Sequence, residues 1–293
     1  MPELPEVHTI VSDLKKILPG LKIRDIWTDW PKLVKYPVGF EKFKKELVNR
    51  KILGATRKGK NILIDLFGNK TLLVHQKMTG HLLYGKWKLE KGKWTSTEKG
   101  PLKEDPQNRF LHIVFNLSNG KQLALSDVRK FAKALVWDTD KLDELKDIKD
   151  IGLDPFDKFF TLEKFTALLK AKTGKIKDAL MKQEVIAGIG NIYSSEILWE
   201  ADVHPLRPAQ SLEKEELRDI YKAIKKILEL GIKNRGDSMV DYRDVYGKKG
   251  GYQLLHKAYK REGEKCPKKD GGIIKRIKWG GRSAFFCPVH QKI

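Results

Sequence analysis

Residues 181–205 have the sequence MKQEVIAGIGNIYSSEILWEADVHP, in which Gly188-Ile189-Gly190-Asn191 separates two helical patterns. Glycines permit a tight turn, and the helix that follows presents backbone N–H groups that have no partner within the helix. Those groups can bind a phosphate, and Asn191 can add a side-chain donor. A Gly-x-Gly pair is equally common in a plain helix–helix turn, so this stretch alone predicts the turn and leaves phosphate binding open.

The regions on either side of this stretch divide the chain. A helical pattern extends from residue 160 to about residue 233, after an acidic, turn-rich segment at 138–158. A Gly-rich polar loop follows at 234–253, and the chain closes with a hairpin in which KRIKW and RSAFF flank Gly280-Gly281. We therefore predict a linker at 138–158, a helical domain at 159–262 that includes the loop, and a finger hairpin at 263–293.

Residues 1–137 predict a different kind of domain. Apolar residues recur at helical spacing from Val7 to Leu18, and Pro19-Gly20 ends that helix. Short β-rich runs follow at 23–27, 61–67, 71–75, 81–87, 111–117 and 122–125, with hairpin signals at Gly68-Asn69 and Asn119-Gly120. The fold class is therefore predicted as α+β, with an N-terminal helix and β-sandwich followed by the helical domain and its C-terminal hairpin.

The charge of the chain points to its partner. The 293 residues include 59 Lys and Arg against 38 Asp and Glu, a formal net charge of +21. Such an excess favours a polyanionic partner, most simply nucleic acid, over a merely basic protein. No apolar run approaches the ~20 residues of a membrane span, and MPELPEVHTI has no signal-peptide pattern. We expect a cytoplasmic protein, located at the nucleoid, with no membrane partner.

The N-terminus can carry chemistry through Pro2. Removal of Met1 would leave Pro2 with a secondary amine, and α-amino groups have a pKa of about 8 against about 10.4 for lysine. A largely neutral amine can attack an electrophilic sugar carbon and form an iminium, with Glu3 beside it to transfer protons. The alternative is that Pro2 and Pro5 only start a helix.

Three further side chains suit the gap that an everted base leaves in a duplex. Met78 lies in HQKMTGH, and Arg129 and Phe131 lie in SDVRKFA, each beside a predicted strand. A flexible apolar side chain, a cation and an aromatic ring can together fill such a gap. Each of them taken singly is more often an ordinary core or surface residue.

The C-terminal hairpin contains a partial metal-binding pattern. Cys266 and Cys287 are the only cysteines, too few for a disulfide framework. Cys287 and His290 have the Cys-x-x-His spacing of metal ligands, whereas no second cysteine follows Cys266. Arg282 directly follows the turn glycines, where it can reach a DNA groove.

In combination these motifs resemble the formamidopyrimidine-DNA glycosylase and endonuclease VIII family, in the correct order over nearly the whole chain. PELPEV at 2–7, GKNILIDL at 59–66, HQKMTGHL at 75–82 and DVRKF at 127–131 are similar to its catalytic-domain motifs. Residues 181–205 resemble its helix–two-turns–helix motif, and GGYQ at 250–253 and GGRSAFFCP at 280–288 resemble its loop and finger. The Arg-x-Phe pair favours the formamidopyrimidine branch.

The resemblance implies catalytic roles for five residues. Pro2 would be the Schiff-base nucleophile, and Glu3 would donate the proton for base loss. Lys60 would contact phosphate and assist proton transfer. Glu6 would hold the lesion pocket or a catalytic water, and Arg282 would be the finger arginine linked to the second elimination.

The resemblance also implies how DNA is bound. A monomer would hold damaged double-stranded DNA in a cleft between its domains, with the lesion nucleotide flipped out. Lys177 and Asn191 would grip the DNA backbone, while Met78, Arg129 and Phe131 would fill the gap. The loop at 234–253 would set the preference among damaged bases.

Two positions depart from the family pattern. The family commonly has His-x-His before its long strand, whereas here Phe110 stands two residues before His112, so one phosphate contact is lost or made by Arg109. The second finger cysteine is also absent, with Lys269 or Asp270 in its place.

Because this cysteine is missing, the finger could either bind zinc or fold without a metal. A zinc site would need the set Cys266, Asp270, Cys287 and His290. A metal-free finger would rely on packing by Ile277, Trp279, Phe285 and Phe286. We expect the metal-free finger, with the zinc site as the alternative, and the chemistry itself requires no cofactor.

The function implied is that of a bifunctional enzyme, a DNA glycosylase and AP lyase. It would excise 8-oxoguanine and formamidopyrimidines from double-stranded DNA through a Pro2 Schiff base, with β- and δ-elimination. Two alternatives stay open. One is the same chemistry on oxidised pyrimidines, and the other is a non-catalytic protein that binds lesion or abasic DNA.

Overall fold

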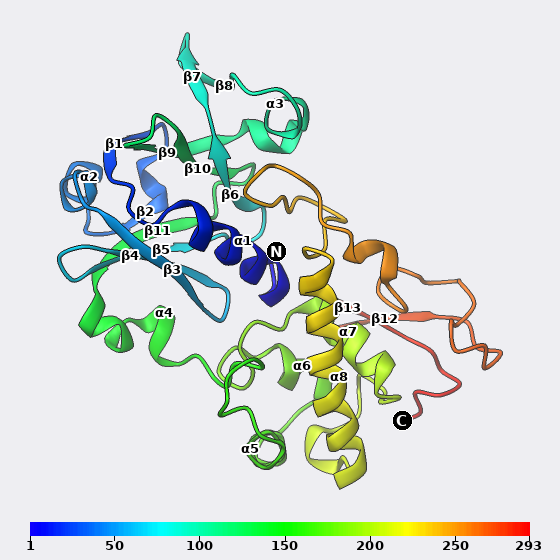
Figure 1. Ribbon diagram of the computed structural model, residues 1–293. Helices are drawn as coiled ribbons and strands as arrows, with labels where there is room; N and C mark the ends of the chain where they lie inside the picture. The colour runs from blue at the N-terminus through cyan, green and yellow to red at the C-terminus, as the bar shows by residue number, and fades with distance from the viewer. The chain divides into compact units, whose positions relative to one another are not determined.

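The computed structural model covers all 293 residues and forms two structural units. The first unit comprises Met1–Lys149 and Asn234–Gly251, and the second comprises Asp150–Lys233 and Tyr252–Ile293. The chain therefore leaves the first unit, builds the helices of the second, and returns to the first as the loop that follows α8 (Figure 1). The predicted α+β class is confirmed.

The predicted domain boundaries differ from these units in two places. Residues 138–158 are not a linker throughout, because η3 (Thr139–Glu144) and α4 (Lys146–Lys149) belong to the first unit. Most of the loop predicted inside the helical domain also belongs to the first unit. Its Tyr242 and Val245 are buried in the core of that unit, a long-range contact that local sequence patterns do not reveal.

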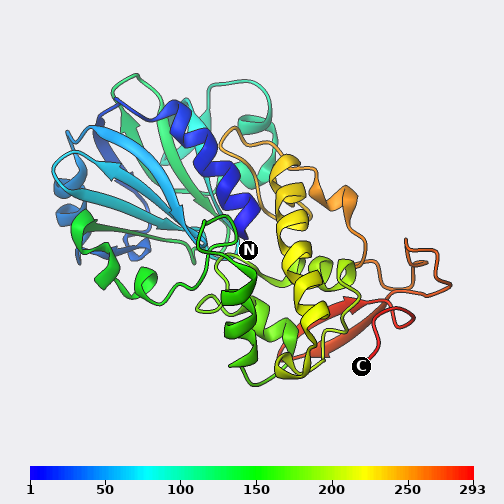
Figure 2. The ribbon, with the colours of Figure 1, turned by 60° about the horizontal axis from the view of Figure 1, so that its bottom comes forward.

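Two β-sheets form the frame of the first unit (Figures 1 and 2). One has the order β1-β9-β10-β6, the other β2-β11-β5-β4-β3, and all neighbours are antiparallel except β2 and β11. The strands span β1 Ile23–Thr28, β2 Val34–Tyr36, β3 Ile52–Lys58, β4 Asn61–Leu66, β5 Lys70–His75, β6 Gly80–Gly85, β9 Leu111–Leu117, β10 Gln122–Asp127 and β11 Lys133–Asp138.

The six predicted strands are present, with one difference. The run predicted at 81–87 ends at Gly85, and Trp87 begins the separate hairpin of β7 (Trp87–Glu90) and β8 (Lys93–Ser96). The smaller helical elements of this unit are η1 (Pro31–Leu33), α2 (Phe40–Leu47), α3 (Pro101–Glu104) and η2 (Pro106–Arg109).

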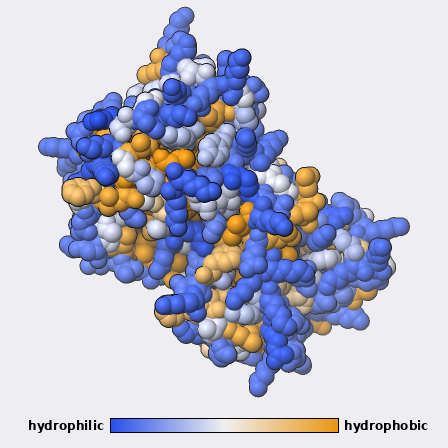
Figure 3. Space-filling view, in the orientation of Figure 1, coloured by the Kyte–Doolittle hydropathy of each residue, from blue (hydrophilic) through white to orange (hydrophobic).

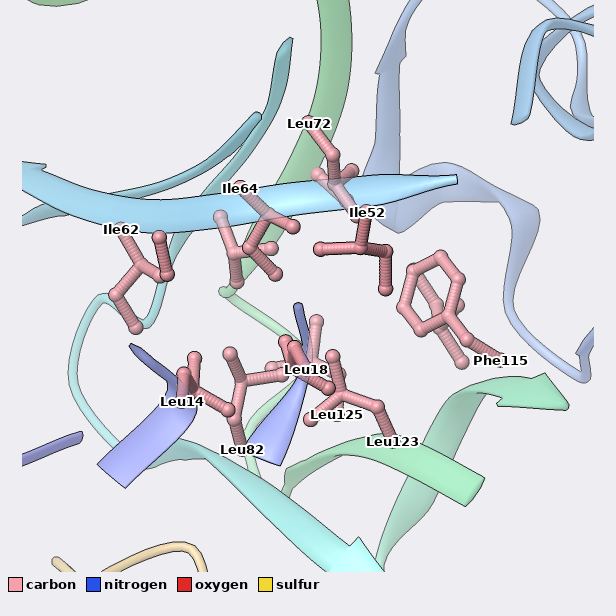
Figure 4. Packing of buried hydrophobic residues seen from close by; sticks show 14 of the residues in the cluster. Leu14, Leu18, Ile52, Ile62, Ile64, Leu72, Leu82, Phe115, Leu123 and Leu125 are labelled. Carbon is pink, nitrogen blue, oxygen red and sulfur yellow. The ribbon is translucent and has the colours of Figure 1, made fainter. Parts of the chain in front are cut away.

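The core of the first unit lies between the sheets and α1 (Leu4–Ile17). Ile62 and Ile64 alternate along β4, so they point to the same face, toward Leu82 of β6 and Leu125 of β10 (Figure 4). Leu14 of α1 meets this cluster with no exposed surface. Burial of one face of α1 fixes the helix on the sheet and thereby fixes the position of its N-terminus.

The second unit is helical and ends in a hairpin. Its elements are α5 (Leu162–Lys170), α6 (Ile176–Met181), α7 (Asn191–Glu200), η4 (Ala209–Ser211), α8 (Lys214–Lys233), η5 (Tyr252–Leu255), β12 (Lys275–Trp279) and β13 (Arg282–Phe286). The hairpin has the predicted strands KRIKW and RSAFF, paired with Trp279 opposite Arg282. Hydrophilic residues dominate the face drawn in Figure 3, in keeping with the charge of the sequence.

Helix α7 is the centre of the second unit, since it packs against α6, α8 and β13. Glu196 on this helix is fully buried, and its carboxylate accepts hydrogen bonds from the backbone N–H groups of Lys257, Ala258 and Tyr259 at 2.7–3.0 Å. A buried carboxylate is stable only when its oxygens are satisfied in this way. Glu196 therefore fixes the segment that leads into the finger.

Candidate active site and DNA-binding residues

The N-terminus of α1 brings together three of the predicted catalytic residues. Pro2 and Glu3 are buried, and Glu6 is 1% exposed. One carboxylate oxygen of Glu6 accepts the Glu3 N–H at 2.7 Å, and the other accepts the Asp237 N–H, also at 2.7 Å. Glu6 therefore joins the start of α1 to the loop Asn234–Gly251 within the first unit.

Gly236 allows this close approach of the loop to α1. Its φ of +84° lies in the left-handed region, and a Cβ at this position would lie 2.7 Å from Oε1 of Glu6. Any side chain here would displace either the loop or the Glu6 carboxylate. The sequence pattern had pointed to the loop as a whole, and it gave no signal for the Glu6–Asp237 hydrogen bond.

Lys60 lies in a cluster of basic groups at the ends of neighbouring strands. It follows Gly59 in the turn between β3 and β4 and is 6% exposed. His75 of β5 pairs in register with Asn61 of β4 and Lys133 of β11. Burial and the nearby cations Lys77, Lys133 and Lys60 lower the pKa of His75 to about 3, so this imidazole is neutral at physiological pH.

This basic cluster, defined as Lys60, His75, Lys77 and Lys133, can bind an anion such as a phosphate. Burial, and to a lesser extent the Lys133 cation, lower the pKa of Lys77, while Asp147, which forms an ion pair with Lys133, opposes the shift. His75 and Lys77 lie within the predicted motif HQKMTGH. Lys133 had no sequence signal, because only the strand register brings it to His75.

The three predicted gap-filling residues lie together. Nη1 of Arg129 is 3.2 Å from Sδ of Met78, and the Arg129 guanidinium carbon is 4.6 Å from the centre of the Phe131 ring. Met78 and Phe131 are 45% and 51% exposed. Large apolar side chains with this much exposure on a basic surface are suited to contact with a ligand.

Asp127 shapes the turn that carries Arg129 and Phe131. Its buried carboxylate accepts hydrogen bonds from the backbone N–H groups of Arg129 at 3.2 Å and Ala132 at 2.6 Å, and from the Thr79 hydroxyl. These bonds close the turn and bring it to the segment that holds Met78. Asp127 lies within the motif DVRKF, but no local sequence signal distinguishes its role in the turn.

His112 is held by an aspartate rather than by a second histidine. Its Nδ1 lies 2.8 Å from Oδ1 of Asp29, and the residue is 6% exposed. Its Nε2 is buried without a hydrogen-bond partner in the protein. Phe110 and Arg109 are exposed beside it, so Arg109 is available for the contact that the missing histidine would have made.

Lys177 and Asn191 are in contact, although Lys177 is less accessible than a DNA-gripping side chain would be. Lys177 is 3% exposed, and its ammonium donates to the hydroxyls of Ser194 and Ser195 at 2.8 and 2.7 Å and to the Asn191 carbonyl at 3.2 Å. Asn191 is the first residue of α7. The structure therefore places Lys177 beneath the first turn of α7.

Arg282 is exposed at the start of β13, directly after Gly280 and Gly281, both of which have positive φ. Arg282 and Asn191 line the same hollow of about 660 Å³ within the second unit, together with Arg276 and Lys260. Basic side chains and a helix N-terminus around one hollow suit a phosphate.

Four potential metal ligands meet in the finger, namely Cys266, Asp270, Cys287 and His290. One ligand atom from each lies within 4.8 Å of all the others. The Sγ of Cys266 is 3.8 Å from Nδ1 of His290, and the Sγ of Cys287 is 3.3 Å from Oδ2 of Asp270. Tetrahedral zinc with ordinary bond lengths separates its ligand atoms by about 3.5 Å. The two distances given are close to that value, whereas Nδ1 of His290 and Oδ2 of Asp270 share a short hydrogen bond and would have to move apart to take the ion.

Comparisons with known proteins match the chain from end to end. Residues 1–134 match the model of the formamidopyrimidine-DNA glycosylase N-terminal domain, and residues 151–242 match that of the formamidopyrimidine-DNA glycosylase H2TH domain. Formamidopyrimidine-DNA glycosylases of Pelotomaculum thermopropionicum and Desulforamulus reducens are 40% and 38% identical. The alignments cover all of this chain and 100% and 99% of those proteins.

Solved structures agree. A Lactococcus lactis FPG mutant bound to DNA that contains Fapy-dG, and MutM bound to DNA that contains carbocyclic 8-oxo-G, are each 32% identical over the full length of both chains. Their TM-scores are 0.86 and 0.85. No helix of the present structure combines the length and apolar character that crossing a bilayer requires. The chain therefore belongs to the formamidopyrimidine-DNA glycosylase family, whose members are DNA-repair glycosylases with AP lyase activity.

Proposed function

We propose that this protein excises 8-oxoguanine and formamidopyrimidines from double-stranded DNA, with Pro2 as its nucleophile. The observation that carries the proposal is the start of α1, where Pro2 and Glu3 adjoin Glu6 and the loop bound to it. The Pro2 nitrogen attacks C1′ of the damaged nucleotide, and the base departs with the electrons of the glycosidic bond while Glu3 supplies a proton. The C1′–O4′ bond of the sugar then breaks, O4′ takes a proton, and the iminium that results permits β-elimination and then δ-elimination.

The proposal requires that Met1 be removed. While Met1 is present, the Pro2 nitrogen forms a peptide bond with it, and its electron pair is delocalised and not available for attack. The mass of the intact protein distinguishes the two forms, because loss of one methionine residue is readily resolved. Only the processed form is expected to react.

The test is a comparison of lesions in otherwise identical duplexes. A duplex with 8-oxoguanine opposite cytosine is expected to be cleaved to β,δ-elimination products and to crosslink to the protein when borohydride is added. A duplex with an oxidised pyrimidine is expected to react more slowly. The reverse order would support the endonuclease VIII-like alternative, and binding without cleavage or crosslinking would support the non-catalytic one.

Two basic sites support double-stranded DNA as the partner. The basic cluster around Lys60 can bind one phosphate, and the hollow at Asn191 and Arg282 can bind a second. Homologous proteins have been crystallised with damaged or abasic DNA. We propose that the protein acts on such DNA as a monomer, in the cytoplasm.

Salt dependence tests the role of Arg282. Binding is expected to weaken steeply with salt, because basic side chains displace counterions from phosphates. Arg282→Ala is expected to reduce the slope of log K against log[salt] by about one unit. Lys88→Ala removes a cation that is paired with Glu90 on the β7–β8 hairpin, and it serves as the control. An unchanged slope for Arg282→Ala would place the DNA elsewhere.

Removing a gap-filling side chain tests the flipped-out geometry. Arg129→Ala and Phe131→Ala are expected to weaken binding to a lesion duplex by about 10- to 100-fold, since extrusion of a base costs a few kcal/mol that these residues offset. Binding to a single-stranded abasic oligonucleotide, in which there is no gap to fill, is expected to change little. Equal losses on both oligonucleotides would make Arg129 and Phe131 ordinary surface contacts.

We propose also that the finger binds one structural zinc ion through Cys266, Asp270, Cys287 and His290. The proposal is supported by the mutual distances of the four ligand atoms, which favour zinc over the metal-free finger expected from the sequence. Four protein ligands leave no open position, as in structural zinc sites. The ion would fix the fold of the finger and take no part in the chemistry.

A further inference from the structure

The loop Asn234–Gly251, called the lesion loop below, is anchored to α1 by an ion cluster in which the Arg235 side chain is 43% exposed and its two carboxylate partners are buried. Nε and Nη2 of Arg235 donate to Oδ2 of Asp244 at 3.0 and 2.7 Å, and its two Nη atoms donate to the carboxylate of Asp13. The side chains of Asp13 and Asp244 are only 7% and 2% exposed. One guanidinium thus neutralises two buried carboxylates, one from α1 and one from the far side of the lesion loop.

A second set of contacts holds the other side of the lesion loop. Arg243 donates to Asp105 at 2.6 Å, and both side chains are largely buried. Asn108 donates to the Gly247 carbonyl at 3.1 Å, and Tyr84 N–H donates to the Val245 carbonyl at 2.7 Å. The lesion loop is therefore attached at both flanks before any ligand is present.

Helix α1 and the lesion loop, which Arg235 joins, differ in the other contacts that hold them in place. Helix α1 buries Leu4, Val7, Ile10 and Leu14 completely, so its place on the sheet does not depend on Asp13. The lesion loop contributes only Tyr242 and Val245 to the core, and its first turn relies on hydrogen bonds. Loss of Arg235 would leave two buried carboxylates without their cation, a costly arrangement that the loop can relieve by moving away.

We propose that Arg235 is a positioning residue that keeps the lesion loop preassembled on α1, so that the Asp237 N–H is already bound to Glu6 when a damaged base enters. The inference rests on the proposed function, because it assigns the loop to recognition of the base. Arg235 acts through Asp13 and Asp244 and does not take part in bond breaking. Base excision needs the ordered loop, whereas elimination at a site that has already lost its base depends on Pro2 and Arg282 and needs no contact from the loop.

Arg235→Gln separates these two steps. Single-turnover excision of 8-oxoguanine is expected to fall about 100-fold, the size of effect that misplacing a contact by about 1 Å can have. Cleavage and borohydride trapping on a preformed abasic site are expected to stay at the wild-type rate. Hydrogen exchange of peptides within 234–251 is expected to speed up, while exchange within α1 is unchanged.

Two further variants make the experiment specific. Arg218→Gln removes an arginine from an exposed pair with Glu215 and is expected to change none of these rates. Asp13→Asn is expected to resemble Arg235→Gln, and the double variant is expected to lose no more than the more severe of the two single variants. If Arg235→Gln does not fold, Arg235→Lys takes its place. A lysine retains one positive charge but cannot bind both carboxylates through a planar guanidinium. Its excision rate is therefore expected to fall less than that of Arg235→Gln, with no change in abasic-site cleavage.

The outcomes that overturn the inference are distinct. Equal losses of excision and abasic-site cleavage would mean that Arg235 supports the helix or the whole fold. Unchanged exchange within 234–251 would mean that the loop does not need its anchor. A wild-type protein without any excision would instead refute the proposed function, while the exchange measurement would still test the anchor.

Discussion

Acetylation of the Pro2 nitrogen is expected to abolish borohydride trapping on lesion duplex, and Pro2→Gly is expected to reduce it by about 100-fold. An acetylated nitrogen has no electron pair available for attack. A glycine amine keeps one, but it loses the ring that fixes the backbone at the start of α1 and fills the buried position of Pro2. Trapping is measured with processed protein whose mass confirms the loss of Met1.

The control for this experiment is Lys60, an amine of the basic cluster that could replace Pro2. Lys60 is 6% exposed, and its amine is a primary amine at the end of a flexible side chain. Lys60→Ala is expected to lower the rate through lost phosphate contact while trapping persists. Full trapping by the acetylated chain, together with its loss in Lys60→Ala, would move the nucleophile to Lys60.

Elemental analysis of protein purified without chelator is expected to find about one zinc per chain. Structural zinc contributes roughly 10–16 kcal/mol of apparent binding free energy in small fingers. Cys287→Ser is therefore expected to release the ion, unfold residues 263–293 and remove most DNA binding. Chelation is expected to produce the same change in the unaltered protein.

Lys269→Ala provides a matched control for the finger. This residue lies beside Asp270 at the position of the absent cysteine, yet it is not among the four clustered residues. It is expected to retain the full zinc content. Less than a tenth of an equivalent of zinc in a protein that binds DNA normally would restore the metal-free finger, held by packing of Phe285 against Tyr259 at 5.2 Å between ring centres.

The parts of the fold that the sequence predicted are those with local signals. A hydrophobic period identifies helix α1 and the strands with clear alternation. Turn residues identify the hairpin at Gly280-Gly281. Strand β3 was missed because Gly54 and two basic residues interrupt its pattern, and its place depends on pairing with β4. The resemblance to a family supplied the order of the motifs, while the return of residues 234–251 to the first unit has no local signal.

The residues of the candidate site likewise divide into those with a local sequence signal and those without one. Pro2, Glu3 and Glu6 adjoin one another in the sequence, so their proximity on α1 was predictable. Arg235 and Asp13 are 222 residues apart, and nothing local indicates that they pair. The burial of Lys177 was also unforeseen, since the hydroxyls that hold it belong to the next helix.

The return of the chain to the first unit has a consequence for biosynthesis. A ribosome releases residues 1–149 first, yet the partners of Asp13 and Glu6 lie at 235–244 and emerge only after all four helices of the second unit. The first unit therefore cannot reach its final state while the chain is growing through residue 233. A nascent or truncated product that stops there carries Pro2 without the loop that we propose recognises the base.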